Sequence, residues 1–305
     1  MKEIKQPGEH SFVISPYLDP IEKVKPGEEV VIYTEDAFES RISNETDVPS
    51  EKLGTYLNPQ TGPIYIEGAE PGDTLVAHII DIEPTRDWAV SILNPYFGGL
   101  TATPTTKMLH DPLPEKVWIY KLTDGMLVNN TQLSFPWRPF MGTIGTAPEI
   151  EAISALAPGD YGGNMDVPDV KPGNSVYLPV NVEGAYFYTG DCHAGQGEGE
   201  LCGVAMEITG KVTMKFELIK GKTIDWPRIE SPTELMAVGS AKPMEDAARI
   251  AYGELIEWMI ELGWDQWDAY QALTQIGKLY VGNMVDTTYS LVAKIEKKYA
   301  FIDNN

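Results

Sequence analysis

The chain has 305 residues, and 23 Lys and Arg residues stand against 45 Asp and Glu residues, which gives a net charge of −22. A surface this acidic repels phosphate backbones and anionic bilayers, so we expect neither nucleic acid nor a membrane as a partner. The 28 Gly and 23 Pro residues predict many short strands and turns rather than a helical bundle, and the 43% hydrophobic content excludes a disordered chain.

The sequence also indicates a cytoplasmic protein. No stretch reaches the roughly 18 apolar residues that a membrane span needs, and no apolar core follows the first charged residues as it does in a signal peptide. The two cysteines, Cys192 and Cys202, are too few for a disulfide framework, which favours a reducing compartment.

Residues 1–240 are predicted to form short strands separated by turns. The predicted strands are rich in Val, Ile, Tyr and Phe, and each is bounded by Gly, Pro or Asp. They span residues 30–38, 63–69, 73–84, 116–122, 175–182, 185–190 and 211–219. The Pro-Gly pairs predict type II turns, because Pro fixes the first corner and Gly supplies a positive φ at the second. These pairs lie at 26–27, 71–72, 158–159 and 172–173.

Helical patterning begins near residue 243. Pro243 stands at an expected first helical position, apolar residues recur at helical spacing after it, and Gly263 ends this helix. A second helix is expected over 264–277, with Asp265 as its N-cap. Residues 290–301 alternate and predict a late strand.

These elements predict a mainly β fold, similar to a β-sandwich with many short strands, and a C-terminal α+β portion. Residues 1–240 are expected to form a β-rich lobe that carries the active site, and residues 241–305 to pack on it. The aromatic residues of WDQWDAY (264–270) either pack the second helix on its own sheet, which we favour, or serve a subunit contact.

The densest chemical segment is 190–208, which contains two candidate metal ligands among acids and glycines. Asp191 and His193 are two residues apart, so on an extended backbone their side chains lie on the same face. A carboxylate and an imidazole on one face suit a zinc-like ion or an acid–base pair. Glu198, Glu200 and Glu207 add negative charge. The alternative is an exposed acidic hairpin with a hydrogen-bonded histidine.

Three other segments carry candidate polar residues. Asn164 and Asp166 lie in a Gly-rich loop that either reaches a pocket or forms a plain Asx turn. Glu149 follows the Gly-punctuated segment 139–148 and is a candidate buried acid. Asp36 follows the first predicted strand and either binds a metal or belongs to a solvated face.

A cysteine nucleophile is not expected. Strand alternation points Cys192 away from the face of Asp191 and His193, and neighbouring acids raise a thiol pKa. The sequence also lacks a Gly-x-Ser-x-Gly elbow, a P-loop and a His-Glu-x-x-His motif.

Taken together, four segments resemble the acetamidase/formamidase family of amide hydrolases. They are TGPIYIEGAEPGDTLVAHIIDI (61–82), PFMGTIGTAPE (139–149), PGDYGGNMDV (158–167) and VYLPVNVEGAYFYTGDCHAGQGEGELCGVAMEI (176–208). One departure is Glu198, where the family pattern leads us to expect Asp; the charge is kept.

The resemblance implies hydrolysis of a short aliphatic amide, such as formamide or acetamide, to a carboxylate and ammonia. It also implies a mainly β fold, a cytoplasmic homo-oligomer, and a divalent metal, with zinc or calcium as candidates. Two alternatives stay open. One is a metal-dependent hydrolase of another C–N bond, such as a lactam, and the other is a non-catalytic β protein whose acidic loop holds calcium.

Amide hydrolysis needs an activated nucleophile, because an amide carbonyl is a poor electrophile. A metal lowers the pKa of bound water from 15.7 toward about 7 and polarises the carbonyl. We expect Asp36, Asp191 and His193 to bind that metal. A His ligand favours zinc, whereas calcium favours oxygen ligands alone.

The remaining catalytic roles need a proton carrier and an oxyanion donor. Glu149 is the first expected acid–base residue and Glu200 the second. Asn164 or a backbone N–H of its loop is expected to bind the oxyanion, and Asp166 to organise that loop.

Overall fold

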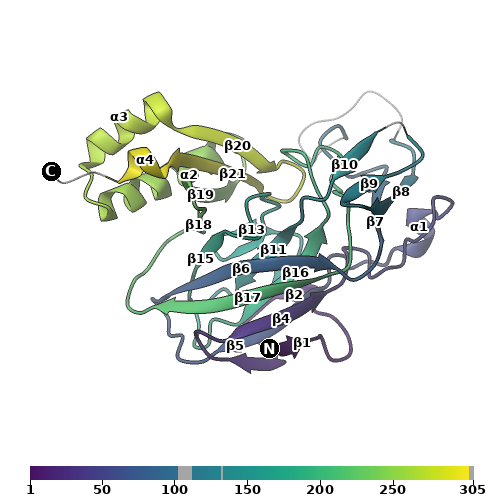
Figure 1. Ribbon diagram of the computed structural model, residues 1–305, viewed down its shortest axis with the longest axis horizontal. Coiled ribbons are helices and arrows are strands. Elements are labelled where there is room, and N and C mark those ends of the chain that lie inside the picture. Colours follow the sequence, from purple (N-terminus) through teal and green to yellow (C-terminus); the bar gives the residue numbers. More distant parts are fainter. Residues whose placement is uncertain (102–111, 132, 302–305) are drawn as a thin grey trace.

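The described part of the chain forms four β-sheets, so the fold is mainly β, as the sequence predicts (Figure 1). The computed structural model describes residues 1–101, 112–131 and 133–301. The largest sheet has nine strands, in the order β1 (Lys2–Ile4), β4 (Glu29–Thr34), β17 (Gly210–Ile219), β6 (Thr74–Pro84), β15 (Ser175–Pro179), β18 (Arg228–Glu230), β19 (Glu234–Ala241), β21 (Tyr289–Glu296) and β20 (Lys278–Asn283). The second sheet has six strands, in the order β13 (Pro158–Gly159), β14 (Gly162–Asn164), β11 (Phe140–Thr146), β16 (Phe187–His193), β5 (Gln60–Ile66) and β3 (Glu22–Val24).

Two smaller sheets and four helices complete the described elements. The four-stranded sheet has the order β10 (Ser134–Pro136), β9 (Met126–Val128), β8 (Lys116–Thr123) and β7 (Trp88–Leu93), and the two-stranded sheet pairs β12 (Ile153–Ser154) with β2 (Val13–Ile14). The helices are α1 (Pro49–Lys52), α2 (Met244–Glu261), α3 (Gln266–Ile276) and α4 (Lys297–Ala300). Among the described residues, none of the helices combines the length and apolar composition that a membrane span requires.

The nine-stranded and six-stranded sheets share one hydrophobic core. In β17, alternate side chains point into this core, including Val212, Met214 and Phe216. The rings of Phe216 and Phe187, one from each sheet, meet edge to face with centroids 4.8 Å apart. The two sheets therefore pack as a sandwich, which agrees with the predicted architecture.

Strand β16 is the element that positions the site. It runs between β11 and β5, and all seven of its residues are buried. The predicted strand stops at residue 190, but the observed one continues to His193, because pairing with β11 extends until His193 lies opposite Phe140. The strand therefore carries Asp191 and His193 on a rigid central element.

Three of the four Pro-Gly pairs form the predicted kind of turn. Gly27, Gly72 and Gly173 have φ of 88°, 90° and 88°, the left-handed values that glycine adopts without a steric cost. The fourth prediction is wrong. Pro158 and Gly159 form β13, which pairs with β14.

The C-terminal residues form two longer helices, α2 and α3, whose buried residues share a core with strands of the nine-stranded sheet, and the short helix α4. Leu255 and Met259 of α2 share a core with Leu235 of β19 and Ala293 of β21. The Asp265 side chain accepts hydrogen bonds at the start of α3, so the predicted N-cap is confirmed. The predicted strand 290–301 is shorter than expected, because its last four residues before Phe301 form α4.

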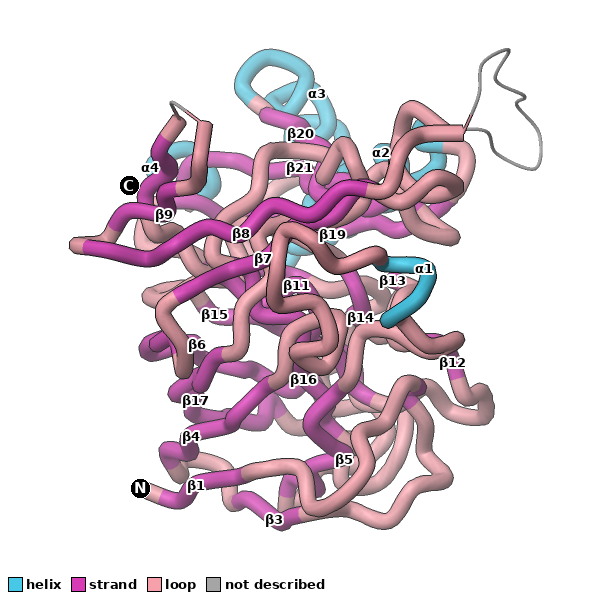
Figure 2. The backbone as a smooth tube through the Cα atoms, turned by 90° about the vertical axis from the view of Figure 1, so that its right-hand side faces the viewer, coloured by secondary structure: helices cyan, strands magenta, loops and turns pink. Residues whose placement is uncertain are grey.

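The four-stranded sheet lies at the opposite end of the molecule from the C-terminal helices (Figure 1). Figure 2 looks onto that end and shows β7, β8 and α1 facing the viewer together. A hydrogen bond of 2.6 Å from the Ser50 backbone N–H to Glu115 joins α1 to the segment that leads into β8. Strands from both sides of residue 240 belong to the nine-stranded sheet, and the division into lobes 1–240 and 241–305 stays a prediction.

Candidate active site

Four buried side chains converge at the end of β16. His193 and Asp191 meet, as their spacing predicts, with His193 Nε2 3.3 Å from Asp191 Oδ2. Glu207 lies on a segment that forms a β-bridge with His193, and its Oε1 is 3.4 Å from the same nitrogen. Asp166 Oδ1 is 3.9 Å from it. One imidazole nitrogen therefore faces three carboxylates.

Two further acids bring the number of buried carboxylates in this cluster to five. Asp166, Asp191, Glu200, Glu207 and Asp286 are each at most 7% exposed. Burial raises the pKa of Asp166, Glu200 and Glu207 well above the usual carboxyl range, and neighbouring carboxylates raise it further. Burial raises the pKa of Asp286 to about 7. The cluster therefore resists holding all of its negative charges without a cation.

His193 carries the compensating positive charge in the described structure. Burial by itself lowers the pKa of this imidazole, but the charges of Glu207 and Asp191 outweigh burial and raise the pKa to about 10. A single imidazolium cannot neutralise five carboxylates.

Three asparagines hold the carboxylates in place. Asn164 Nδ2 donates to Asp166 Oδ2 and to Asp286 Oδ2, both at 2.9 Å. Asn283 Nδ2 donates to the same two oxygens, with 2.6 Å to Asp166. Asn58 Nδ2 in turn donates to Asn164 Oδ1 at 2.7 Å. The amide hydrogens of Asn164 are thus used on carboxylates.

The cluster forms one wall of a cavity of about 310 Å³. The polar residues that line it are Asn58, Asn94, Asn164, Asp191, Glu200, Glu207 and Asp286. The apolar ones include Phe38, Leu53, Leu57, Ile92, Phe97, Leu156 and Val204. A mostly apolar cavity with a few convergent polar groups is the usual form of a small-molecule site.

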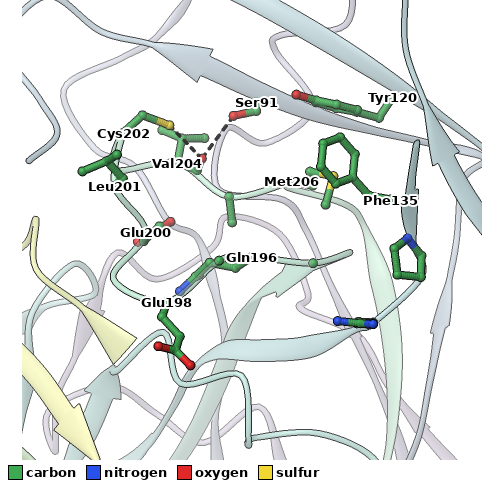
Figure 3. A pocket seen from close by; sticks show the side chains of 15 residues that line it. Ser91, Tyr120, Phe135, Gln196, Glu198, Glu200, Leu201, Cys202, Val204 and Met206 are labelled. Carbon is green, nitrogen blue, oxygen red and sulfur yellow. Dashed lines mark hydrogen bonds between the residues drawn. The ribbon is translucent and has the colours of Figure 1, made fainter. Parts of the chain in front are cut away.

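A larger cavity of about 770 Å³ lies against the turn that follows β16, and Figure 3 shows its lining residues. Glu200 and Val204 line this cavity as well as the smaller one. The segment that carries them therefore separates the two spaces, and the Glu200 side chain contributes to both.

The donor atoms of the cluster fit a divalent cation. Asp166, Asp191 and His193 offer atoms within 4.8 Å of one another, and so do His193, Glu200 and Glu207. Two carboxylate oxygens, Asp166 Oδ1 and Glu207 Oε2, are buried without a hydrogen-bond partner. Unpartnered buried carboxylate oxygens are costly unless a cation binds them. The buried cluster can thus bind a metal ion.

Comparison with known proteins agrees with this arrangement. Residues 14–158 and 149–288 match the model of the acetamidase/formamidase family. The chain belongs to this family.

Solved structures of other members share the fold over nearly the whole chain. An acetamidase from Yersinia enterocolitica is 44% identical, with a TM-score of 0.95, and the match covers 99% of this chain and 93% of that one. An acetamidase from Bacillus halodurans is 31% identical, with a TM-score of 0.90 and coverage of 97% and 98%. Among curated relatives, the acetamidase of Mycolicibacterium smegmatis is 29% identical over 65% of this chain. The matches span only 62%, 63% and 63% of the length of three curated family members.

The structure does not bring Asp36, an expected metal ligand, into the cluster. Asp36 Oδ1 accepts hydrogen bonds from the backbone N–H groups of Phe38 and Ser40, at 2.8 and 2.9 Å. Its Oδ2 lies 2.6 Å from Arg86 Nη1. The side chain therefore closes the turn after β4, and Arg86 neutralises its charge.

Glu149 also lies outside the cluster. Its side chain is exposed and lines a different cavity of about 390 Å³, together with Asp160 and Asp225. A proton carrier must reach the reacting atoms, so this position does not suit the expected acid–base role. Glu200, the second choice, belongs to the cluster.

The fold brings to the site several residues for which the sequence alone predicts no role. Glu207 is noted only as an acid of its segment, and Asn58, Gln196, Asn283 and Asp286 receive no role. One signal for the last pair is the segment GNMVD at 282–286, which repeats the Gly, Asn, Met and Asp content of GGNMD at 162–166.

Proposed function

We propose that the protein hydrolyses short aliphatic amides, with formamide and acetamide as the first candidates, to a carboxylate and ammonia. Family membership and the names of its relatives support amide hydrolysis. The observation that carries the proposal is the convergence of three carboxylates on His193 Nε2, two of which, Asp191 and Glu207, line a small cavity. A neutral amide needs no charge steering to reach such a site.

His193, Asp191, Glu207 and Asp166 are the residues we expect to hold a divalent metal. The unpartnered oxygens of Asp166 and Glu207 and the excess of carboxylates support this set. His193 favours zinc over calcium, because calcium prefers oxygen ligands alone. A divalent metal in such a site lowers the pKa of bound water and polarises a carbonyl oxygen.

Glu200 is our candidate for the proton carrier. Its carboxyl group is buried, it lies within the same set of donor atoms as His193 and Glu207, and it lines the cavity. In the proposed reaction it accepts a proton as water attacks the carbonyl carbon, and it then donates a proton to the nitrogen as the C–N bond breaks. Ammonia leaves, and the carboxylic acid that remains releases its proton to give the carboxylate.

Asn164 has a different role from the one expected. Both of its amide hydrogens are donated to Asp166 and Asp286, so they are not free for an oxyanion. We assign Asn164 and Asn283 the task of fixing these two carboxylates. Asp166 then both organises its loop and offers Oδ1 to the metal.

Ammonia release from formamide, acetamide, propionamide and a lactam tests the function. We expect turnover of the linear amides, loss of activity after chelation, and recovery with zinc. His193→Ala should lower kcat/KM by about 10³-fold or more, since a metal supplies several kcal/mol of barrier reduction. His10→Ala, a histidine substitution outside the cluster, is the control. Full activity and metal content in His193→Ala would refute the scheme, and turnover of the lactam alone would change the substrate class.

A matched pair of Glu→Gln substitutions tests the proton carrier. Glu200→Gln should lower kcat by about 10²- to 10⁴-fold, the usual contribution of general acid–base catalysis. Glu149→Gln should leave kcat within about twofold, since exposed substitutions away from a site have small effects. The reverse result would return the role to Glu149.

We also propose a homo-oligomer, as the sequence resemblance implies. The structure leaves Trp267 and Tyr270 of α3 exposed, at 68% and 59%, while Trp264 packs against the core of α2. The favoured packing of these aromatics on their own sheet thus holds for Trp264 and not for the other two. Light scattering after size exclusion measures the subunit number.

A further inference from the structure

The side-chain amide of Gln196 has only one chemically reasonable orientation. Its Nε2 donates to the backbone carbonyl oxygens of Asp166 and Gly282, both at 3.0 Å. Turning the amide over would place its oxygen against these two acceptors, which have no hydrogen to donate. Gln196 Oε1 therefore faces His193 Nδ1, at 3.0 Å.

This orientation determines which imidazole nitrogen keeps its hydrogen. An amide oxygen only accepts hydrogen bonds, so His193 Nδ1 must donate one. Nε2 is then the nitrogen that offers a lone pair when the ring is neutral. It is also the nitrogen that faces Asp191 and Glu207, at 3.3 and 3.4 Å.

Packing fixes the plane of the same ring. Phe140 lies opposite His193 on the neighbouring strand β11, and the two rings meet edge to face with centroids 4.8 Å apart and an interplanar angle of 81°. Phe140 limits rotation of the imidazole, and Gln196 selects its tautomer.

We propose that Gln196 is a positioning residue that presents His193 Nε2 to the metal by accepting a hydrogen bond from Nδ1. The inference rests on the proposed function, since it concerns the same metal. Gln196 also ties β16 to the backbone of the Asp166 loop and, through Gly282, to β20. Three separate chain segments that carry site residues are therefore held by one amide.

Zinc affinity, measured by competition with a chelator, tests the proposal without an activity assay. Gln196→Met has a similar size but removes the acceptor, whereas Gln196→Glu keeps an oxygen for Nδ1. Gln196→Met should bind zinc about 10- to 100-fold more weakly, the usual loss when a hydrogen-bond partner of a metal-bound histidine is removed. Gln196→Glu keeps the acceptor for Nδ1 but places a second oxygen against the carbonyls of Asp166 and Gly282, so it should unfold more easily than the wild type and still bind zinc more tightly than Gln196→Met. Gln271→Met, on the exposed face of α3, is the matched control and should not change affinity.

Two results overturn the proposal: Gln196→Met that binds zinc as tightly as the wild type, or Gln196→Glu that binds as weakly as Gln196→Met.

A second readout needs no variant. The chain has only four histidines, so ¹H–¹⁵N spectra of the zinc-loaded wild type can identify the nitrogen of His193 that keeps its proton. A proton on Nδ1 supports the proposal, and a proton on Nε2 overturns it. Wild-type protein that binds no zinc or hydrolyses no amide overturns the proposed function itself, which is a distinguishable failure.

Discussion

Asp36 and Asp191 are both buried carboxylates near strand ends, but their surroundings differ. Asp36 receives two backbone N–H hydrogen bonds and the guanidinium of Arg86, so its charge is neutralised within the protein. Asp191 faces His193 in a cluster with four other acids. Removing each side chain should therefore affect different properties.

Asp36→Ala should lower the free energy of unfolding by roughly 3–5 kcal/mol, because it leaves Arg86 as a largely buried unpaired charge. Its zinc stoichiometry should equal that of the wild type. Asp191→Ala should lose tight zinc binding while the metal-free protein loses less stability. Urea unfolding and zinc titration of both variants measure these properties. Loss of zinc from Asp36→Ala at unchanged stability would restore Asp36 as a ligand.

At the residue scale, the sequence can identify candidate ligands that are close together in the chain. Asp191 and His193 are two residues apart on β16, so the two-residue period predicts that their side chains meet, although the observed backbone of Asp191 has a φ of 58° rather than an extended value. The pairing of Asp36 with Arg86 could not be predicted, because nothing local indicates a partner 50 positions away. The exposed position of Glu149 could not be predicted for the related reason that it depends on tertiary packing.

At the scale of elements, several strands are predictable from composition. Strands β4, β6, β8 and β17 are rich in Val, Ile and Tyr and lie between turn residues, so their positions agree with the sequence. Strand β20 is not predicted, since only Gly277 separates KLYVGN from α3 and buried and exposed residues do not alternate along it. Without this strand, the sequence gives no reason to place Asn283, which ends β20, or Asp286, in the loop after it, at the site.

The order of strands explains why the sequence alone does not place Glu207 beside His193. Asp191 and Glu207 are 16 residues apart, and the chain between them turns back so that Glu207 bridges to His193 and to Val90 of β7. This turn of the chain depends on long-range strand pairing, which a local sequence pattern does not predict. The six-stranded sheet, the four-stranded sheet and the C-terminal strands each supply part of the site.

At the scale of the whole molecule, part of the net charge of −22 is concentrated in one buried cluster of acids. Most acids lie on the surface, but five are buried together around His193. A buried set of like charges is stable only if protons or a cation neutralise it. If the cluster binds the proposed metal, protons and metal compete for this one place, which would couple the stability of the protein to pH.

The metal-free protein should lose stability as pH rises from 5 to 9. The pKa of His193 is raised from 6.5 to about 10, so its contribution is complete below pH 6.5 and is lost as pH rises toward 10. The pKa of Asp286 is raised from 3.8 to about 7, so the folded state keeps a proton that the unfolded chain releases, and stability again falls with rising pH, here between 3.8 and 7. Both groups bind more protons in the folded state than in the unfolded chain, so each of them lowers the stability of the protein as pH rises.

Zinc should reverse this dependence, because its ligands bind in their deprotonated forms. Thermal unfolding from pH 5 to 9, with chelator and with excess zinc, measures both curves. We expect Tm to fall as pH rises when chelator is present, and the difference in Tm between the zinc and chelator curves to increase with pH. Asp286→Asn should flatten the chelator curve between pH 5 and 7, where Asp286 titrates in the folded state. A metal-free Tm that rises across this range would contradict the coupling, because it would mean that the buried acids are ionised without a cation.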